Sequence, residues 1–277
     1  MGSIISLKNV TFAYETVNET DNKRIILENI TFDIKEGEFL CIVGKNGCGK
    51  STLAHLFNAL NLPVEGDVYV DGINTKDETK TLDIRKTVGM VFQNPDNQII
   101  ASVVEEDVAF GLENIGVPSE EIIKKVDESL KLLELEKYRK DSPNKLSGGQ
   151  KQKVALAGVL AMKPKVIVLD EVTSMLDPYS RKEVLDKVHE LSEKENITII
   201  LITHFMEEVV DCDRVILLDD KGIVYDGDPK GAFMDKERLR KCNLLLPNVV
   251  RIANGLREKG INIKEDTLRY EDLISQL

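Results

Sequence analysis

The stretch Gly44-Lys45-Asn46-Gly47-Cys48-Gly49-Lys50-Ser51 decides the fold of this chain. It matches the pattern G-x-x-x-x-G-K-[ST], whose glycines allow a tight turn with backbone N–H groups around phosphate oxygens. An apolar run of strand length, 39–43, precedes it, and residues 51–60 have helical character. A helix N-terminus adds free N–H donors and the positive end of a dipole. The alternative is a glycine-rich turn that binds nothing, but the flanking strand and helix favour a nucleotide site.

Each residue type in this loop has an expected role. Lys50 would reach the β- and γ-phosphates, and Ser51 would place its hydroxyl on Mg²⁺. Upstream, Tyr14 would stack on an adenine ring, although without further motifs an ordinary strand aromatic would be the favoured explanation. The predicted contacts of the loop with the nucleotide are Gly44, Lys45, Asn46, Gly47, Cys48, Gly49, Lys50, Ser51 and Thr52.

The composition is that of a globular protein without membrane spans. The 277 residues are 42% hydrophobic and 31% charged, and no apolar run approaches the ~20 residues that a membrane span requires. Residues 1–8 lack the basic and apolar regions of a signal peptide, so we expect a cytoplasmic protein. A net charge of −11 argues against a nucleic-acid partner, because phosphate neutralisation needs basic surface. The four cysteines form no C-x-x-C pair, which argues against zinc and disulfide frameworks.

Polar residues follow several apolar strands at the points where these strands end. Gln93 follows the run 88–92, Asp170 and Glu171 follow 166–169, and His204 comes soon after 197–202. Apolar strands that alternate with helices indicate a parallel sheet, and ligands of such sheets bind at the carboxyl ends of the strands. We therefore expect these side chains to converge with Lys50 on one site.

This convergence gives each side chain a candidate role in nucleotide hydrolysis. Asp170 would hold Mg²⁺ together with Ser51 and Gln93, and Glu171 would orient or deprotonate the attacking water. Gln93 would sense the γ-phosphate, the metal or the water. His204 would contact the γ-phosphate or hold Glu171 in place. The alternative is that the two acids only begin a loop and that the histidine is structural, as we expect of His55 and His189 in helical stretches.

The segment Leu146-Ser147-Gly148-Gly149-Gln150 indicates which class of nucleotide-hydrolysing protein this is, because it resembles the signature of ATP-binding-cassette (ABC) ATPases. The resemblance covers residues 3 to about 227. It implies an α/β fold, with a RecA-like, mostly parallel sheet core, an antiparallel β subdomain and a helical subdomain inserted at about 94–150. In that family the signature, here Ser147, Gly148, Gly149 and Gln150, binds the γ-phosphate held by an opposite subunit. The resemblance therefore implies ATP, Mg²⁺ and a second ABC ATPase subunit.

A finer resemblance concerns the segment 93–98, which is similar to the Q-x-P-x-x-Q segment of the ATPases of energy-coupling factor (ECF) importers. Residues 107–111 and 171–178 are similar to the same proteins, with a minor departure at Val172. In ECF systems this region receives coupling helices of the transmembrane T subunit, and Gln98 is the matching residue here. Residues 174–177 resemble the loop that makes contacts across the ATPase dimer and fit one of two paralogue types, which favours a heterodimer.

The expected function is therefore ATP hydrolysis coupled to uptake of vitamins or other micronutrients, at the cytoplasmic face of the membrane, with substrate-binding S subunits as indirect partners. Another importer class and a soluble ABC protein of translation or DNA repair are the alternatives. Residues 1–227 would form the ABC ATPase domain. The tail, 228–277, would be a small C-terminal extension that pairs subunits, or else a helix packed on its own domain. The transported substrate has no signal in this sequence.

Overall fold

The structure is a computed structural model that describes residues 2–15 and 24–277. The polar sequence of residues 16–24 predicts a hairpin loop, which lies outside this part apart from its last residue. A six-stranded sheet forms the centre, in the order β10-β9-β3-β8-β7-β6. Strands β3, β8, β7 and β6 are parallel to their neighbours, and β9 is parallel to β3. Strand β10 runs antiparallel to β9. Their bounds are β3 (Phe39–Gly44), β6 (Val88–Val91), β7 (Val166–Asp170), β8 (Thr198–Ile202), β9 (Arg214–Asp219) and β10 (Gly222–Gly227).

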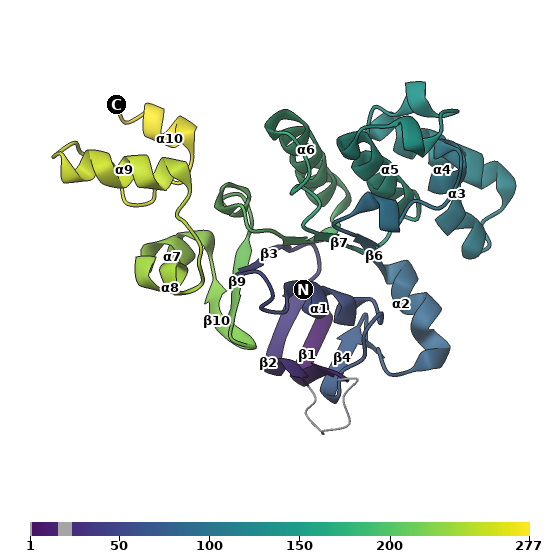
Figure 1. The fold of residues 1–277 in the computed structure, drawn as a ribbon, viewed down its shortest axis with the longest axis horizontal. Helices are drawn as coiled ribbons and strands as arrows, with labels where there is room; N and C mark the ends of the chain where they lie inside the picture. Colours follow the sequence, from purple (N-terminus) through teal and green to yellow (C-terminus); the bar gives the residue numbers. More distant parts are fainter. Residues whose placement is uncertain (1, 16–23) are drawn as a thin grey trace.

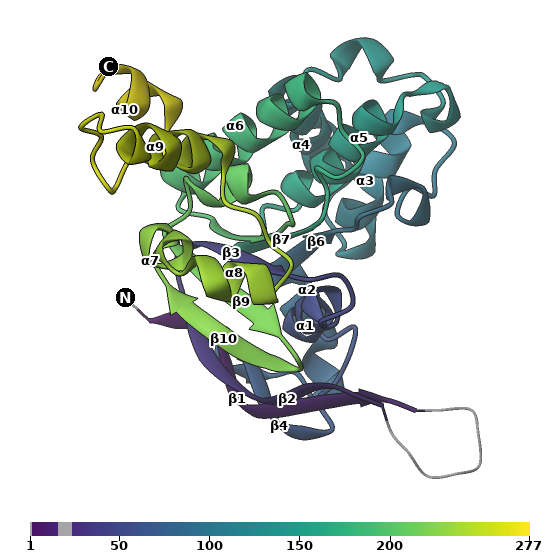
Figure 2. The same ribbon diagram turned by 60° about the vertical axis from the view of Figure 1, so that its left-hand side comes forward.

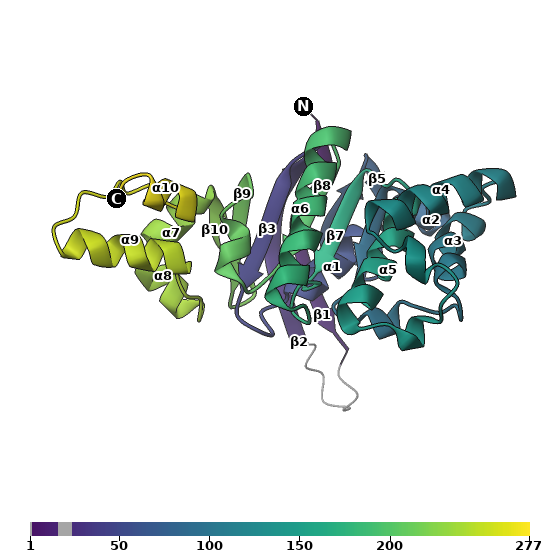
Figure 3. The ribbon, with the colours of Figure 1, turned by 90° about the horizontal axis from the view of Figure 1, so that it is seen from above.

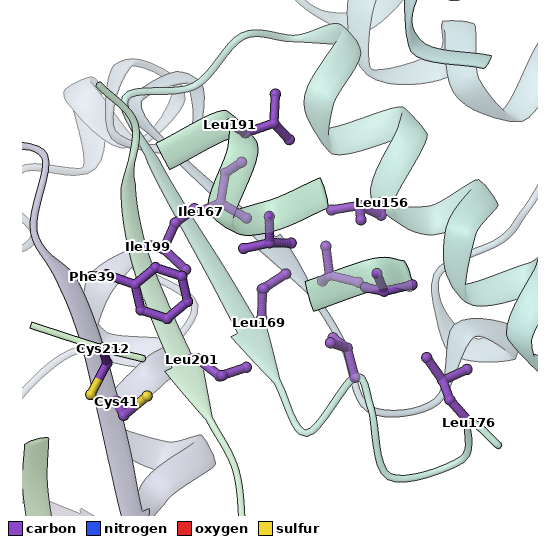
Figure 4. Close-up of a cluster of buried hydrophobic side chains, with 14 of the residues drawn as sticks. Phe39, Cys41, Leu156, Ile167, Leu169, Leu176, Leu191, Ile199, Leu201 and Cys212 are labelled. Atoms are coloured by element: carbon purple, nitrogen blue, oxygen red, sulfur yellow. The ribbon is translucent and has the colours of Figure 1, made fainter. Parts of the chain in front are cut away.

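The four parallel strands β3, β6, β7 and β8 are buried along their whole length, because helices or a second sheet cover both faces. Figure 4 shows one of these faces, where Phe39, Ile167, Leu169, Ile199 and Leu201 meet side chains of the covering helices. The helices behind this core are α3 (Val104–Asn114), α4 (Ser119–Leu132), α5 (Gly148–Ala161) and α6 (Pro178–Glu195).

The opposite face of the central sheet packs on α1 (Lys50–Phe57), which lies between the two sheets of the molecule (Figure 2). Strand residues alternate between faces, so Leu40 and Ile42 point to this side while their neighbours point to the other. The second sheet is antiparallel, with the order β2-β1-β4-β5. Its strands are β1 (Ser3–Tyr14), β2 (Arg24–Lys35), β4 (Glu65–Val70) and β5 (Ile73–Asn74), and α2 (Thr81–Thr87) follows them.

Two helical groups lie at opposite ends of the central sheet (Figures 1 and 3). Helices α3, α4 and α5 gather beyond β6, and the C-terminal helices lie beyond β10. The latter are α7 (Pro229–Met234), α8 (Lys236–Lys241), α9 (Asn248–Glu258) and α10 (Tyr270–Ile274). Within the described residues, no helix is both long and apolar enough to cross a membrane. The expected α/β class, with a mostly parallel core and a separate antiparallel sheet, is confirmed.

Short 3-10 helices shape the connections between these elements. They are η1 (Glu78–Lys80), η2 (Pro95–Asn97), η3 (Glu136–Tyr138), η4 (Pro143–Lys145) and η5 (Met206–Val209). Helix η2 follows β6, and η5 follows β8. Both therefore lie just beyond the carboxyl ends of parallel strands, where the sequence places its polar residues.

Candidate functional site

The loop between β3 and α1 forms a concave backbone surface at the N-terminus of α1. Gly47 and Gly49 have φ values of 79° and 104°, which lie in the left-handed region that favours glycine. Gly49 is also the N-cap of α1, and no side chain caps the first turn of this helix. The first N–H groups of α1 are therefore free to donate to an anion.

Lys50 lies at the centre of this surface and is 4% exposed. Its ammonium donates to the carbonyl oxygens of Gly44 and Lys45, at 3.0 and 3.2 Å. It also lies 3.6 Å from Oε1 of Glu171. A buried ammonium needs such partners, and the same geometry offers a positive charge to phosphate oxygens at the mouth of the loop.

Ser51 and Asp170 form the part of the site suited to a metal. The Ser51 hydroxyl donates to Oδ1 of Asp170 at 3.0 Å. Burial raises the pKa of Asp170, and the Ser51 hydrogen bond opposes this shift. In residues 2–15 and 24–277, no group of three or more His, Cys, Asp or Glu side chains is placed to hold a metal. The Ser51 hydroxyl and the Asp170 carboxylate are hard oxygen donors, and Mg²⁺ commonly takes one or two such protein oxygens and completes its shell with phosphates and water.

The Glu171 side chain, just after β7, is approached by side chains that follow two other strands, β6 and β8. Its Oε2 accepts a hydrogen bond from Nε2 of Gln93 at 3.0 Å and lies 3.9 Å from Nδ1 of His204. Its φ is 50°, which is rare for a residue with a side chain and is found preferentially at functional positions. The carboxylate is 14% exposed. It is thus partly shielded from water, yet open to a small ligand at the phosphate loop.

A cavity of about 490 Å³ adjoins this constellation. Tyr14 lies at its edge, with its hydroxyl 3.3 Å from the Thr52 hydroxyl, so the second sheet contributes an aromatic ring next to the phosphate loop. Arg24 and Ile26 also line the cavity. The sequence does not predict them, because a strand that begins after a polar stretch carries no motif. The full lining is Tyr14, Arg24, Ile26, Asn46, Gly47, Gly49, Lys50, Ser51, Thr52, Gln93 and Glu171.

Not all predicted nucleotide contacts face this cavity with their side chains. Lys45 points away from it, because its ammonium pairs with Asp219 at 2.6 Å and Asp220 at 2.9 Å, and these carboxylates raise the pKa of Lys45. Cys48 is buried, and that burial raises the pKa of its thiol. His204 lines a separate cavity of about 580 Å³ on the other side of the loop, together with Gly44, Lys45 and Asn46.

The signature residues lie apart from the 490 Å³ cavity at the phosphate loop, since its lining includes none of Ser147, Gly148, Gly149 and Gln150. Ser147 is the N-cap of α5 and forms a capping box with Gln150. The Gln150 amide also donates to the Tyr138 hydroxyl at 2.7 Å. Both side chains are therefore engaged within the chain.

Gln98 has its side chain turned toward its own chain. Its Oε1 accepts from the Phe92 N–H at 3.1 Å and its Nε2 donates to the Met90 carbonyl at 3.3 Å. These bonds fix the loop that carries Gln93. In this structure Gln98 therefore shapes the loop surface.

A model of the family described as ABC transporter matches residues 27–174. The chain belongs to the ABC transporter family. The expected resemblance to ABC ATPases is thereby confirmed, and the phosphate loop and Asp170-Glu171 lie within the matched region. As a member of this family the chain is an ATP-binding ATPase cassette.

Full-length relatives of this cassette carry ECF names. The chain is 52% identical over 275 residues to the "Energy-coupling factor transporter ATP-binding protein EcfA1" of Caldanaerobacter subterraneus, covering 99% of this chain and 98% of the relative. It is 48% identical to the protein of the same name from Clostridium novyi, with the same coverage.

Two solved structures have the same fold. The cbiO1 protein of Clostridium perfringens, described as part of the ABC transporter complex cbiONQ, is 36% identical with a TM-score of 0.76, covering 92% of this chain and 99% of that one. The cassette MJ0796, solved as a dimer in a post-hydrolysis state with ADP and phosphate, is 34% identical with a TM-score of 0.75, covering 81% of this chain and 98% of its own.

Proposed function

We propose that this cassette is the ATP-hydrolysing subunit of an ECF-type importer and drives the uptake of vitamins or other micronutrients through membrane partners. The observation that carries the chemistry is the position of the Glu171 carboxylate, between the Gln93 amide at 3.0 Å and the Lys50 ammonium at 3.6 Å. The ECF assignment is supported by relatives that match over nearly the whole chain.

The phosphate loop would bind and orient ATP. The free N–H groups at the start of α1 and the Lys50 ammonium would hold the β- and γ-phosphates. The Tyr14 ring would stack on the adenine. Ser51, Asp170 and Gln93 would hold Mg²⁺, which neutralises the charge that develops on the phosphate oxygens when it is bound.

Hydrolysis would then use Glu171 as the general base. The water oxygen forms a bond to the γ-phosphorus while the bond from that phosphorus to the β–γ bridging oxygen breaks. The proton of the water passes to the Glu171 carboxylate, and ADP and inorganic phosphate leave. His204, 3.9 Å from this carboxylate, would keep it aimed at the water or contact the γ-phosphate.

The signature would serve the site of a second cassette. Ser147, Gly148 and Gly149 begin α5 but do not line their own chain's nucleotide cavity, so a partner ATPase would bring its nucleotide to them. Residues 174–177, with Met175 57% exposed, would make contacts across this dimer. We infer a paralogue as the partner, and the C-terminal extension, 228–277, would add to the pairing.

Membrane attachment would come through the T subunit, with the S subunits as indirect partners, so the cassette would be peripheral at the cytoplasmic face. The loop that Gln98 shapes would receive the coupling helices, with exposed neighbours such as Ile100 making the direct contact. Residues 1–227 would act as the ATPase domain, including the helical subdomain at about 94–150.

The test is affinity purification of the tagged full chain from solubilised membranes, with mass spectrometry of the proteins that accompany it. A second cassette, one T-type membrane protein and several small membrane proteins would support the ECF assignment and the heterodimer. A dedicated permease pair with a solute-binding protein would move the chain to another importer class. Ribosomes or DNA would overturn a transport role.

A further inference from the structure

A buried carboxylate lies directly behind the His204 loop. Glu208 belongs to η5, and its side chain is 2% exposed. Neither of its carboxylate oxygens has a hydrogen-bond partner among the described residues. The nearest cation is Arg181 of α6, whose Nε lies 3.7 Å from Oε1. Burying a charge with so few partners is unfavourable unless another requirement retains it.

Arg181 connects the two loops that carry the hydrolytic side chains. Its Nη2 donates to the Leu176 carbonyl at 3.4 Å, in the loop that follows Glu171. Its guanidinium carbon lies 3.6 Å from the centre of the Phe205 ring, in the loop that follows β8. Arginine favours such stacking because its planar group is polar at the edge and weakly hydrated on its faces.

The contacts continue from Phe205 to the reaction site. The Phe205 ring lies against the His204 ring, with centroids 4.1 Å apart, and His204 Nδ1 is 3.9 Å from the Glu171 carboxylate. The Thr173 hydroxyl, two residues after Glu171, is also buried without a partner in the described part of the chain. Arg181 therefore contacts Glu208, the loop that follows Glu171, and Phe205, whose ring lies against His204.

This polar cluster is unfavourable for folding in its ionised form. Burial raises the pKa of Glu208, and the positive charge of Arg181 opposes this shift. A carboxyl whose pKa is raised on folding loses stabilising free energy as the pH rises through that pKa. A residue that lowers stability at neutral pH is typical of a functional requirement.

We propose that Glu208 is a positioning residue for ATP hydrolysis. Through Arg181 it fixes the position of the loop 171–177 relative to the loop 203–206, so that Glu171 and His204 reach the attacking water together. This inference rests on the proposed function, because it concerns the same reaction. Glu208 itself touches neither substrate nor the reacting atoms.

The test compares E208Q with E207Q in the full chain, purified in its membrane complex. Glutamine keeps the volume of Glu208 and removes its charge, so Arg181 loses its ionic partner. Misplacing reacting groups by about 1 Å lowers rates by up to about 100-fold, so we expect kcat for ATP hydrolysis to fall about 10- to 100-fold while KM stays unchanged. The melting temperature at neutral pH should stay equal or rise. The matched control, Glu207, is exposed and bonds to Asn248 instead, so E207Q should keep the kcat of the wild type.

A second variant separates positioning from folding. Because Glu208 and Arg181 act as one unit, E208Q and R181Q combined should lower kcat no more than the stronger single change. A kcat of E208Q equal to that of the wild type would overturn the inference, and so would a fall in kcat accompanied by a lower melting temperature and a raised KM. A wild-type complex without ATPase activity would instead overturn the proposed function, before any variant is compared.

Discussion

Replacing Glu171 with glutamine removes the proposed base and leaves the rest of the site in place. The Gln93 amide, 3.0 Å from Oε2, can still donate to the carbonyl oxygen of the new side chain. The variant loses the proton acceptor and the negative charge 3.6 Å from Lys50. General bases contribute about 10²- to 10⁴-fold to a rate, which is about 3 to 5 kcal/mol of the barrier. We expect kcat to fall within that range.

ATP binding should survive the same substitution. The Lys50 side chain is 4% exposed, and a buried ammonium requires a counter-charge. In the wild type Glu171 supplies part of it, so the phosphates of ATP must compete with a carboxylate. In E171Q they have no such competitor, and affinity for ATP should be equal or higher.

Phosphate release at saturating ATP measures the first effect, and equilibrium binding of a fluorescent ATP analogue measures the second. Because E171Q should bind ATP without hydrolysing it, we also expect the ATP-bound dimer of cassettes to persist, and size-exclusion chromatography measures this. The matched control is E36Q, because Glu36 is exposed on the turn before β3 and the chemical change is identical. Unchanged steady-state turnover in E171Q would refute the role of Glu171, and loss of ATP binding would refute the view that only chemistry is affected.

Three further predictions concern the adenine contact of Tyr14, the effect of Asp170 on stability, and the packing of Leu169 in the core. Tyr14→Ala should weaken ATP binding by about 1–3 kcal/mol, the value of one stacked base, whereas Tyr14→Phe should bind almost normally; equal affinity of both variants in calorimetry would place the adenine elsewhere. Burial raises the pKa of Asp170 above its ordinary 3.8. The contribution of Asp170 to the free energy of unfolding is therefore complete below pH 3.8 and is lost as the pH rises through the pKa of the folded state. Asp170→Asn should therefore unfold at a higher denaturant concentration than the wild type near neutral pH, by a margin that shrinks on acidification, and a margin independent of pH would contradict this. Leu169→Ala removes a fully buried core side chain and should lower the free energy of unfolding by about 2–5 kcal/mol; a loss like that of an exposed leucine, such as Leu245→Ala, would be inconsistent with the described packing.

Much of the nucleotide site is predictable because its chemistry is local. The turn at Gly47 and Gly49, the buried strand before it and the helix after it depend on neighbours in the chain, and the structure contains all three. The polar residues at strand ends are predictable for a related reason, since parallel strands end at one edge of a sheet. Gln93 and His204 indeed reach the same oxygen of Glu171.

Side-chain direction was less predictable. Gln98 is prominent in a sequence motif, yet its amide satisfies the backbone at Met90 and Phe92. Lys45 belongs to the phosphate loop, but Asp219 and Asp220 on a distant hairpin hold its ammonium. A motif specifies which residue types are present, and the strongest available partner decides where a flexible side chain points.

The tertiary structure alone decided the contacts between segments that are remote in sequence. The strand order β10-β9-β3-β8-β7-β6 places β8 between β3 and β7, and this order brings His204 beside Glu171. Arg24 comes to line the nucleotide cavity, and Arg181 lies between two loops, without any local signal. The physical reason is that periodicity and turn chemistry report on a residue's neighbours along the chain, whereas hydrophobic burial selects which faces pack together and is nearly independent of sequence separation.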